Sequence, residues 1–119
     1  MSGHTTIWID HEHTYIFDFK ADGLKEKTFK NSGNLDKEHL KSFYHEVAKM
    51  IGSPNQLLIV GPGTAKDEFK HHCEDHHHST LAKVIVGTEV MKDHPRKSQI
   101  LEVSRKFFDH HFAWHNYEA

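Results

Sequence analysis

The chain has 119 residues, of which 27% are charged, and a formal net charge of −2, so it is not a general binder of polyanions. No apolar run approaches the roughly 20 residues that cross a bilayer, no signal peptide is visible, and Cys73 is the single cysteine. We therefore expect one domain, residues 1–119, in the cytoplasm. The unusual feature is 14 histidines, most of which we expect to be solvated surface residues that become charged near pH ~6.5.

The first thirty residues predict a three-stranded antiparallel meander. Residues 5–10, Thr-Thr-Ile-Trp-Ile-Asp, are expected to form the first strand. Residues 14–19 alternate, with Tyr15 and Phe17 on one face, and residues 24–30 form a more polar edge strand. Short polar turns connect the three segments, as expected of neighbouring antiparallel strands.

The stretch QLLIVGPGTAKDEF, residues 56–69, predicts a buried strand that feeds a helix across a tight corner. Residues 57–60 are apolar without alternation, which is typical of a strand covered on both faces. Thr64 is placed to cap the helix, with Asp67 three residues on, as in a capping box. Free amides at such a corner suit phosphate. The candidate anion-binding turn consists of Gly61, Gly63 and Thr64. A purely structural corner is the favoured interpretation, because no GxxxxGK[ST] or GxGxxG pattern is present.

The remaining elements are helices and one more strand. A first helix, capped by Asp36, carries an apolar stripe and ends at Gly52. The second helix is predicted to run over residues 64–78, followed by a buried strand over 83–87 and a loop over 88–94. Pro95 suits the first position of the last helix, which is expected to fray near residue 114.

The predicted order is therefore a three-strand antiparallel meander followed by βαβα. It indicates an α/β fold with a five-stranded mixed sheet and three helices, a topology shared by ribonuclease H-like folds and some translation-factor domains.

The residues along this order resemble a known family, the middle domain of eukaryotic and archaeal class-1 peptide-release factors and of Pelota. The segments 7–10 and 15–17 are similar to its first hairpin, and 47–69 to its helix, strand and Gly-containing corner with Lys-Asp-x-Phe. Residues 94–108 resemble the closing helix of small stand-alone bacterial relatives described as translational machinery proteins. The resemblance implies the release-factor middle-domain topology and a ribosome- or RNA-associated binding domain.

One departure limits what the resemblance implies. Release factors carry Gly-Gly-Gln, which promotes hydrolysis of peptidyl-tRNA, between the third strand and the first helix. Here the loop is Asn-Ser-Gly-Asn, residues 31–34, which is short and has no glutamine. Peptide release is therefore not expected of this chain.

Histidines of the second helix are candidate metal ligands. His72 and His76 lie one helical turn apart, as do Cys73 and His77. Imidazole and thiolate are zinc ligands, so His72 and His76 are the candidate zinc pair. The favoured interpretation is a solvated helix face and no cofactor, because no CxxC or HExxH pattern is present. Other histidine pairs are His11 with His13 and His111 with His115.

A carboxylate at the end of the first strand raises a second hypothesis. Asp10 has the position of a metal-binding carboxylate in ribonuclease H-like nucleases, and such chemistry needs several converging carboxylates. Candidates to join it are Glu12, Asp18, Glu89 and Asp93. A carboxylate that ends a strand in a turn is the favoured interpretation. Cys73 has no base or oxyanion donor assigned to it and is expected to be non-catalytic.

Basic residues of the second half form the candidate RNA-facing surface. The residues are Lys66, Lys70, Lys92, Arg96 and Lys97. The last three surround the start of the last helix, where backbone amides add to the attraction for phosphate. Ordinary solvated charge is an equal alternative.

We favour a non-catalytic, translation-associated factor that binds the ribosome, rRNA or tRNA. The alternatives are a metal-dependent hydrolase or nuclease built on Asp10 and histidines, and a stress- or host-associated interaction protein that shares the fold. No membrane partner is expected. Trp114 and Tyr117 lie beyond the last helix and suggest a homodimer as a further partner hypothesis. Closure of the chain's own core by these two residues is an equal alternative.

Overall fold

Five strands form one mixed sheet in the computed structural model, with order β3-β2-β1-β4-β5. The structure describes residues 3–20, 23–31, 34–92 and 95–108. The elements are β1 (His4–Ile9), β2 (His13–Lys20), β3 (Gly23–Lys30), α1 (Lys37–Ile51), β4 (Gln56–Gly61), α2 (Ala65–His76), the 3-10 turn η1 (Ala82–Val84), β5 (Ile85–Val90) and α3 (Lys97–Phe107). β2 is antiparallel to β1 and β3, whereas β4 is parallel to β1 and β5. The predicted mixed sheet and fold class are confirmed.

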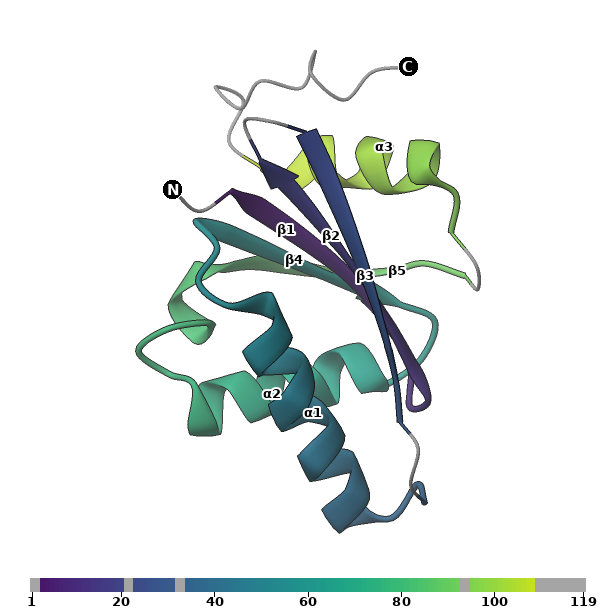
Figure 1. Cartoon of the computed structure of the whole chain (residues 1–119), viewed down its shortest axis with the longest axis vertical. Helices are drawn as coiled ribbons and strands as arrows, with labels where there is room; N and C mark the ends of the chain where they lie inside the picture. The colour runs from purple at the N-terminus through teal and green to yellow at the C-terminus, as the bar shows by residue number, and fades with distance from the viewer. Residues whose placement is uncertain (1–2, 21–22, 32–33, 93–94, 109–119) are drawn as a thin grey trace.

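The sheet is covered on both faces (Figure 1), with α1 and α2 on one side and α3 on the other. Alternation along the central strands explains this arrangement, because successive side chains of a strand point to opposite faces. In β4, Leu57 and Ile59 join the core beneath α1 and α2, while Leu58 and Val60 join the core beneath α3.

Two cores of different character result. The core beneath α1 and α2 includes Tyr44, Val47 and Phe69, all 5% exposed or less. The core beneath α3 is centred on aromatic residues of β1 and β2. A polar contact adds to it, since the hydroxyls of Thr6 and Ser104 lie 2.6 Å apart and fasten α3 to the middle of β1.

The cap predictions for α1 are confirmed. The Asp36 carboxylate accepts the amide of His39 at 2.9 Å, and Gly52 ends the helix with φ 74°, which a Cβ would penalise.

Three predicted boundaries were wrong. The second helix ends at His76, because the carbonyl of His77 accepts the amides of residues 80, 81 and 82 and turns the chain. The strand predicted over 83–87 covers Ile85–Val90, since pairing with β4 continues to its last residue. Pro95 precedes the N-cap Arg96, so α3 begins at Lys97.

No helix in the part of the chain that the structure describes is long and apolar enough to span a bilayer. The predictions for Asp93, His111, Trp114, His115 and Tyr117 concern residues outside the described ranges.

Candidate nucleic-acid interface at the carboxyl edge of the sheet

Several of the predicted site residues lie in loops that meet at one edge of the sheet. β1, β4 and β5 are parallel and β3 runs in the same direction, so the segments that follow these four strands share an edge. We call it the carboxyl edge. The chain leaves β1 toward β2 on one side and returns as β4 on the other. In open α/β sheets, ligands bind outside the carboxyl ends of the strands at such a reversal point.

The Gly-Pro-Gly corner lies at this reversal point. A Cβ on Gly61 would stand 2.2 Å from the carbonyl oxygen of Ile9, so the close approach of β4 to β1 requires glycine there. A Cβ on Gly63 would meet nothing within 4 Å. Thr64 makes no side-chain cap bond, so the predicted capping box is absent. Its hydroxyl instead donates to Glu68 at 3.0 Å.

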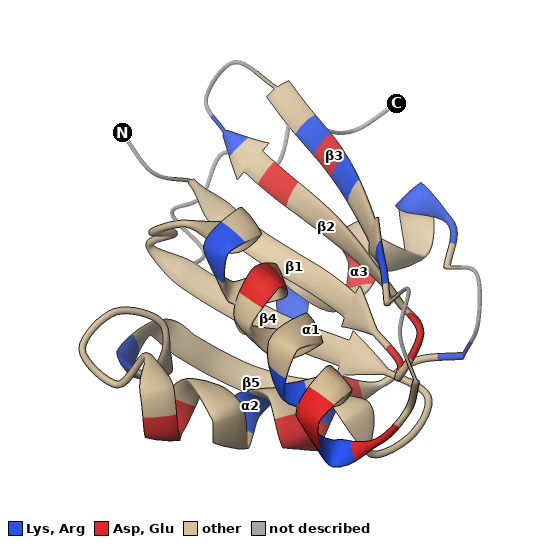
Figure 2. Cartoon of the chain, turned by 60° about the horizontal axis from the view of Figure 1, so that its bottom comes forward, with Lys and Arg blue, Asp and Glu red and all other residues tan. Residues whose placement is uncertain are grey.

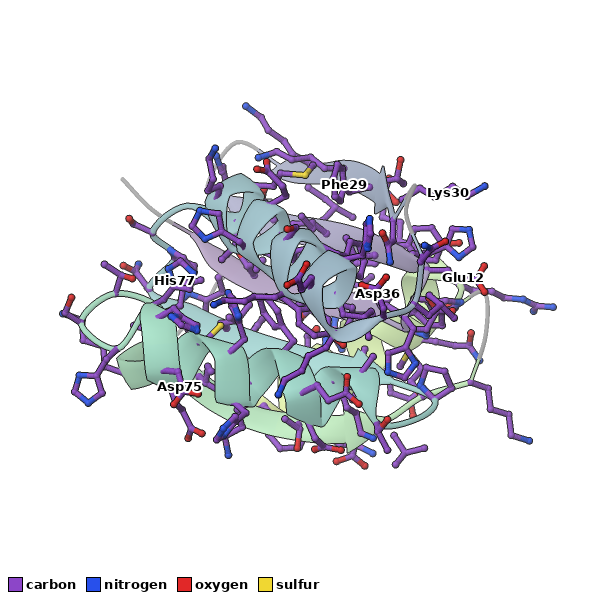
Figure 3. All side chains as sticks on the ribbon, turned by 90° about the horizontal axis from the view of Figure 1, so that it is seen from below. Glu12, Phe29, Lys30, Asp36, Asp75 and His77 are labelled. Atoms are coloured by element: carbon purple, nitrogen blue, oxygen red, sulfur yellow. The ribbon has the colours of Figure 1, made fainter. Side chains whose placement is uncertain are left out.

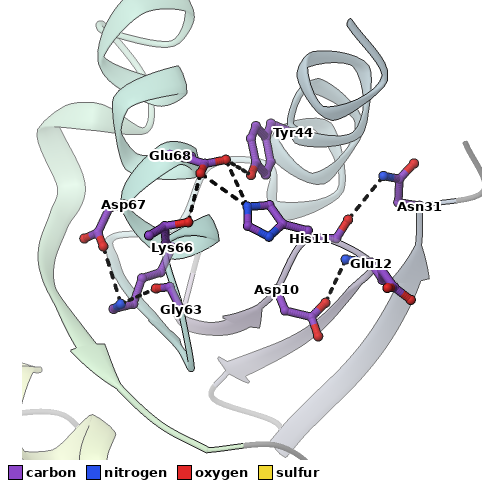
Figure 4. A network of polar contacts seen from close by, with 10 residues as sticks. Asp10, His11, Glu12, Asn31, Tyr44, Gly63, Lys66, Asp67 and Glu68 are labelled. Atoms are coloured by element: carbon purple, nitrogen blue, oxygen red, sulfur yellow. Dashed lines mark hydrogen bonds and ion pairs between the residues drawn. The ribbon is translucent and has the colours of Figure 1, made fainter. Parts of the chain in front are cut away.

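Glu68 is the centre of a polar network at the start of α2 (Figure 4). Tyr44 of α1 donates its hydroxyl to Glu68 Oε1 at 2.8 Å, and His11 Nε2 lies 3.1 Å from the same oxygen. With the bond from Thr64, the carboxylate joins α1, α2 and the β1–β2 turn. Anions placed in the first turn of a helix are also favoured by its dipole.

The network changes the ionisation of its members. Burial pushes the pKa of Glu68 upward, but the hydrogen bonds from Tyr44, His11 and Thr64 outweigh burial and lower it. Burial and the bond to Glu68 raise the pKa of the Tyr44 phenol above its usual range. At neutral pH the pair is therefore a carboxylate that accepts from a neutral phenol, which is a structural joint and not a proton-transfer pair.

Asp10 shapes the β1–β2 turn. Its Oδ1 accepts the amide of Glu12 at 2.8 Å (Figure 4). The same oxygen accepts the amide of His13 at 2.6 Å. Asp18 lies near the opposite end of β2, bound to Thr5 at 2.7 Å. Among the described residues, Asp10 belongs to no group of side chains gathered closely enough to hold a metal.

Lys66 differs from the other residues of the predicted basic surface. It is 8% exposed, and its ammonium donates to the carbonyl of Gly63 and lies 3.4 Å from the carboxylate of Asp67. It stabilises the corner from within. Lys70, further along α2, is half-buried.

The three remaining basic residues are exposed in the segment between the end of β5 and the start of α3. Lys92 follows β5, and Arg96 and Lys97 begin α3 (Figure 2). Trp8, 2% exposed in β1, donates its indole N–H to the carbonyls of Met91 at 3.3 Å and Lys92 at 3.0 Å. The backbone at Lys92 is thus tied to the first strand, which places the cation at the carboxyl edge. Whether these residues bind RNA stays a prediction.

The histidines of α2 differ from the predicted arrangement. His72 is buried and His76 exposed, with ring centroids 4.8 Å apart. The residues that gather with His72 are His45 of α1 and His77, the residue that follows α2. Burial raises the pKa of the neighbouring Cys73 thiol to about 12, so this side chain is a protonated thiol at neutral pH.

Sequence reasoning missed His11, Tyr44 and Glu68 as one network, and His45 as a neighbour of His72. Of these contacts, only the one between Thr64 and Glu68 could have been predicted, from their spacing of four residues at the start of a helix. The other contacts join residues that are far apart in the chain.

Comparison with known proteins supports the predicted resemblance. An archaeal translation termination factor, aRF1, matches 87% of this chain with a TM-score of 0.66 and 16% identity. Pelota from Thermoplasma acidophilum matches 92% with a TM-score of 0.68 and 18% identity. Dom34 of S. cerevisiae, a translation termination-like factor that interacts with Hbs1, matches 87% with a TM-score of 0.62 and 10% identity.

The chain spans about a third of each of those proteins, between 33% and 35%. At these identities the likeness defines a fold. No family model and no curated protein matches the sequence.

Proposed function

We propose that this chain is a cytoplasmic, non-catalytic domain that acts in translation and binds the ribosome, rRNA or tRNA. The observation that carries the proposal is the fold, which is similar to aRF1, Pelota and Dom34 over 87% to 92% of this chain. The likeness in sequence to small stand-alone bacterial proteins belongs to the same proposal. The loop after β3 contains no glutamine, so peptide release is left out of it.

Charge at the carboxyl edge suggests which surface meets RNA. Lys92, Arg96 and Lys97 are exposed and follow one another around the start of α3. Lysine and arginine contacts to phosphate position a protein on nucleic acid without reading its sequence. A surface of this kind suits rRNA or tRNA backbone.

Co-sedimentation with ribosomes at several salt concentrations tests the proposal. We expect the protein to pellet with ribosomes at low salt and to be released as salt rises. Lys92→Glu, Arg96→Glu and Lys97→Glu, combined, should abolish pelleting. The slope of log K against log salt is negative, and single replacements by Ala should each reduce its magnitude by about 0.7 to 0.9.

A matched control reverses three exposed lysines elsewhere. Lys25 in β3, Lys49 in the last turn of α1 and Lys106 in the last turn of α3 serve this purpose. Equal loss in both triple variants would show that only net charge matters, and the edge would then not be the interface. Absence of pelleting at any salt concentration, at pH 7.5 and at pH 6, would refute the translation proposal and favour an interaction protein of another kind.

A further inference from the structure

A second cluster of polar side chains lies between α1 and α2, away from the carboxyl edge. His45 of α1, His72 of α2 and His77 each place a ring nitrogen within 4.8 Å of the other two. The rings of His45 and His77 stack with centroids 5.5 Å apart, and those of His72 and His77 lie 5.3 Å apart. Figure 3 shows His77 at the end of α2, beside α1.

Two of these histidines have ring nitrogens that bind nothing. The Nε2 atoms of His72 and His77 are buried and have no hydrogen-bond partner in the structure. His72 as a whole is 7% exposed. A buried polar atom without a partner costs free energy, and native proteins keep few of them, so each one calls for a ligand or another explanation.

The backbone holds His77 firmly in this position. Its amide donates to the carbonyl of Cys73 at 2.8 Å, and its carbonyl accepts the amides of Leu81 at 3.0 Å and Ala82 at 3.1 Å. A ligand-bearing residue is thus fixed where α2 ends, and the early end of this helix is what turns its ring toward α1.

Space for further ligands lies beside the rings. A hollow of about 520 Å³ opens between the two helices. Its lining is formed by Lys41, Ser42, His45, Glu46, His72 and His76. Because His45 and His72 line this hollow, water has access to the rings of both.

We propose that His45, His72 and His77 bind a divalent zinc ion that joins α1 to α2. Zinc takes imidazole nitrogens at about 2.0 to 2.1 Å, and in a tetrahedral site these nitrogens lie roughly 3.4 Å apart. The three ligand nitrogens now lie within 4.8 Å of one another, so the side chains must turn toward the ion to reach that distance. The fourth position, on the side of the hollow, takes water.

This site is different from the pair predicted on one helix. His76 lies four residues after His72, but it is exposed and stays outside the cluster of three. A single helix offers zinc two neighbouring histidines, whereas two packed helices supply the third ligand and bury one of them.

Zinc titration of the full chain, after treatment with a chelator, tests the proposal. Affinity is measured by competition with a chromophoric chelator, and the coordination geometry by the visible absorption of the Co²⁺ form. We expect wild type to bind one zinc tightly and to show the intense bands of tetrahedral Co²⁺. Zinc at a 100-fold excess over Kd should raise Tm by about 10 °C.

The decisive variant is His45→Gln, because an exposed residue is replaced and folding is spared. Loss of an outer-shell partner of a metal weakens binding about 10- to 100-fold, so loss of this ligand should weaken it by at least ~100-fold and remove the Co²⁺ bands. His71→Gln, an exposed position in the same helix as His72, is the matched control and should keep wild-type affinity.

Three results would overturn the proposal. One is the absence of tight zinc binding by wild type. Another is equal binding by wild type and His45→Gln, which would assign the ion to scattered surface histidines. The third is loss of binding in His76→Gln with retention in His45→Gln, which would return the site to the pair on α2.

Discussion

The same two helices carry a completed polar joint and an incomplete one. Tyr44 and His45 are consecutive in α1, and Glu68 and His72 lie one turn apart in α2. Near the start of α2, Glu68 has three hydrogen-bonding partners, Tyr44, His11 and Thr64. Near the end of α2, by contrast, the buried Nε2 atoms of His72 and His77 have no hydrogen-bond partner. Within one pair of packed helices, the network around Glu68 thus stabilises the fold, whereas the histidines one turn further along α2 keep nitrogens that could bind a ligand.

The largest effect is expected at the corner that precedes α2, because this helix carries residues of both the Glu68 network and the histidine cluster. Gly61→Ala would push a Cβ to 2.2 Å from the Ile9 carbonyl, so β4 and β1 must separate. We expect the free energy of unfolding in urea to fall by about 3 kcal/mol. The control Gly63→Ala, which meets nothing within 4 Å, should change it by less than ~0.5 kcal/mol. Similar losses in the two variants would contradict the close approach of the strands.

The comparison itself is tested by replacing the two neighbours in α1. Tyr44→Phe removes a hydrogen bond to a carboxylate and should lower the free energy of unfolding by about 1.5 kcal/mol. His45→Gln, measured in the presence of a chelator, should change it by less than ~0.5 kcal/mol, because its ring is exposed and contacts the rings of His72 and His77. Denaturant unfolding of both variants gives the two values side by side. A larger loss for His45→Gln than for Tyr44→Phe would mean that the histidine cluster, and not the Glu68 network, contributes more to stability.

Acid should weaken the hydrogen-bond network centred on Glu68. The pKa of Glu68 in the folded protein lies below its usual value of 4.5. Its contribution to stability is therefore present above pH 4.5 and is lost as pH falls through the lower folded-state pKa. Because the side chain is 43% exposed, solvent screening keeps the effect below about 1 kcal/mol.

The check is urea unfolding of wild type and Glu68→Gln at pH 6 and pH 3. We expect the difference between the two proteins to shrink at pH 3. A difference that is constant with pH would mean that the charge of Glu68 contributes nothing.

The smallest effect is expected at Thr64. Its hydroxyl donates to Glu68 at an exposed position, so Thr64→Val should cost about 0.5 kcal/mol in thermal unfolding. Combined with Glu68→Gln, the replacement should cost less than the sum of the two single changes, since both act through one bond. Full additivity would separate Thr64 from the network.

The sequence predicted the fold well because alternation and capping are local signals. Residues 57–60 indicated a strand buried on both faces, and Asp36 and Gly52 marked the ends of α1 as found. The end of α2 was missed because it depends on three amides that bind the carbonyl of His77, which no spacing shows.

Contacts within one helix were likewise easier to predict than contacts between helices. His72 and His76 were paired from a spacing of four, whereas His45 meets His72 only because α1 and α2 pack with those faces together. The same holds for Tyr44 with Glu68, 24 residues apart.

The buried indole of Trp8 has a practical consequence. Its N–H donates to the carbonyls of Met91 and Lys92, so this fluorescent side chain is hydrogen-bonded to the segment that carries the basic residues. In a Trp114→Phe background it becomes the single tryptophan of the chain. A shift of its emission to longer wavelength would then report, in real time and without any label, that this segment has been lifted from the sheet.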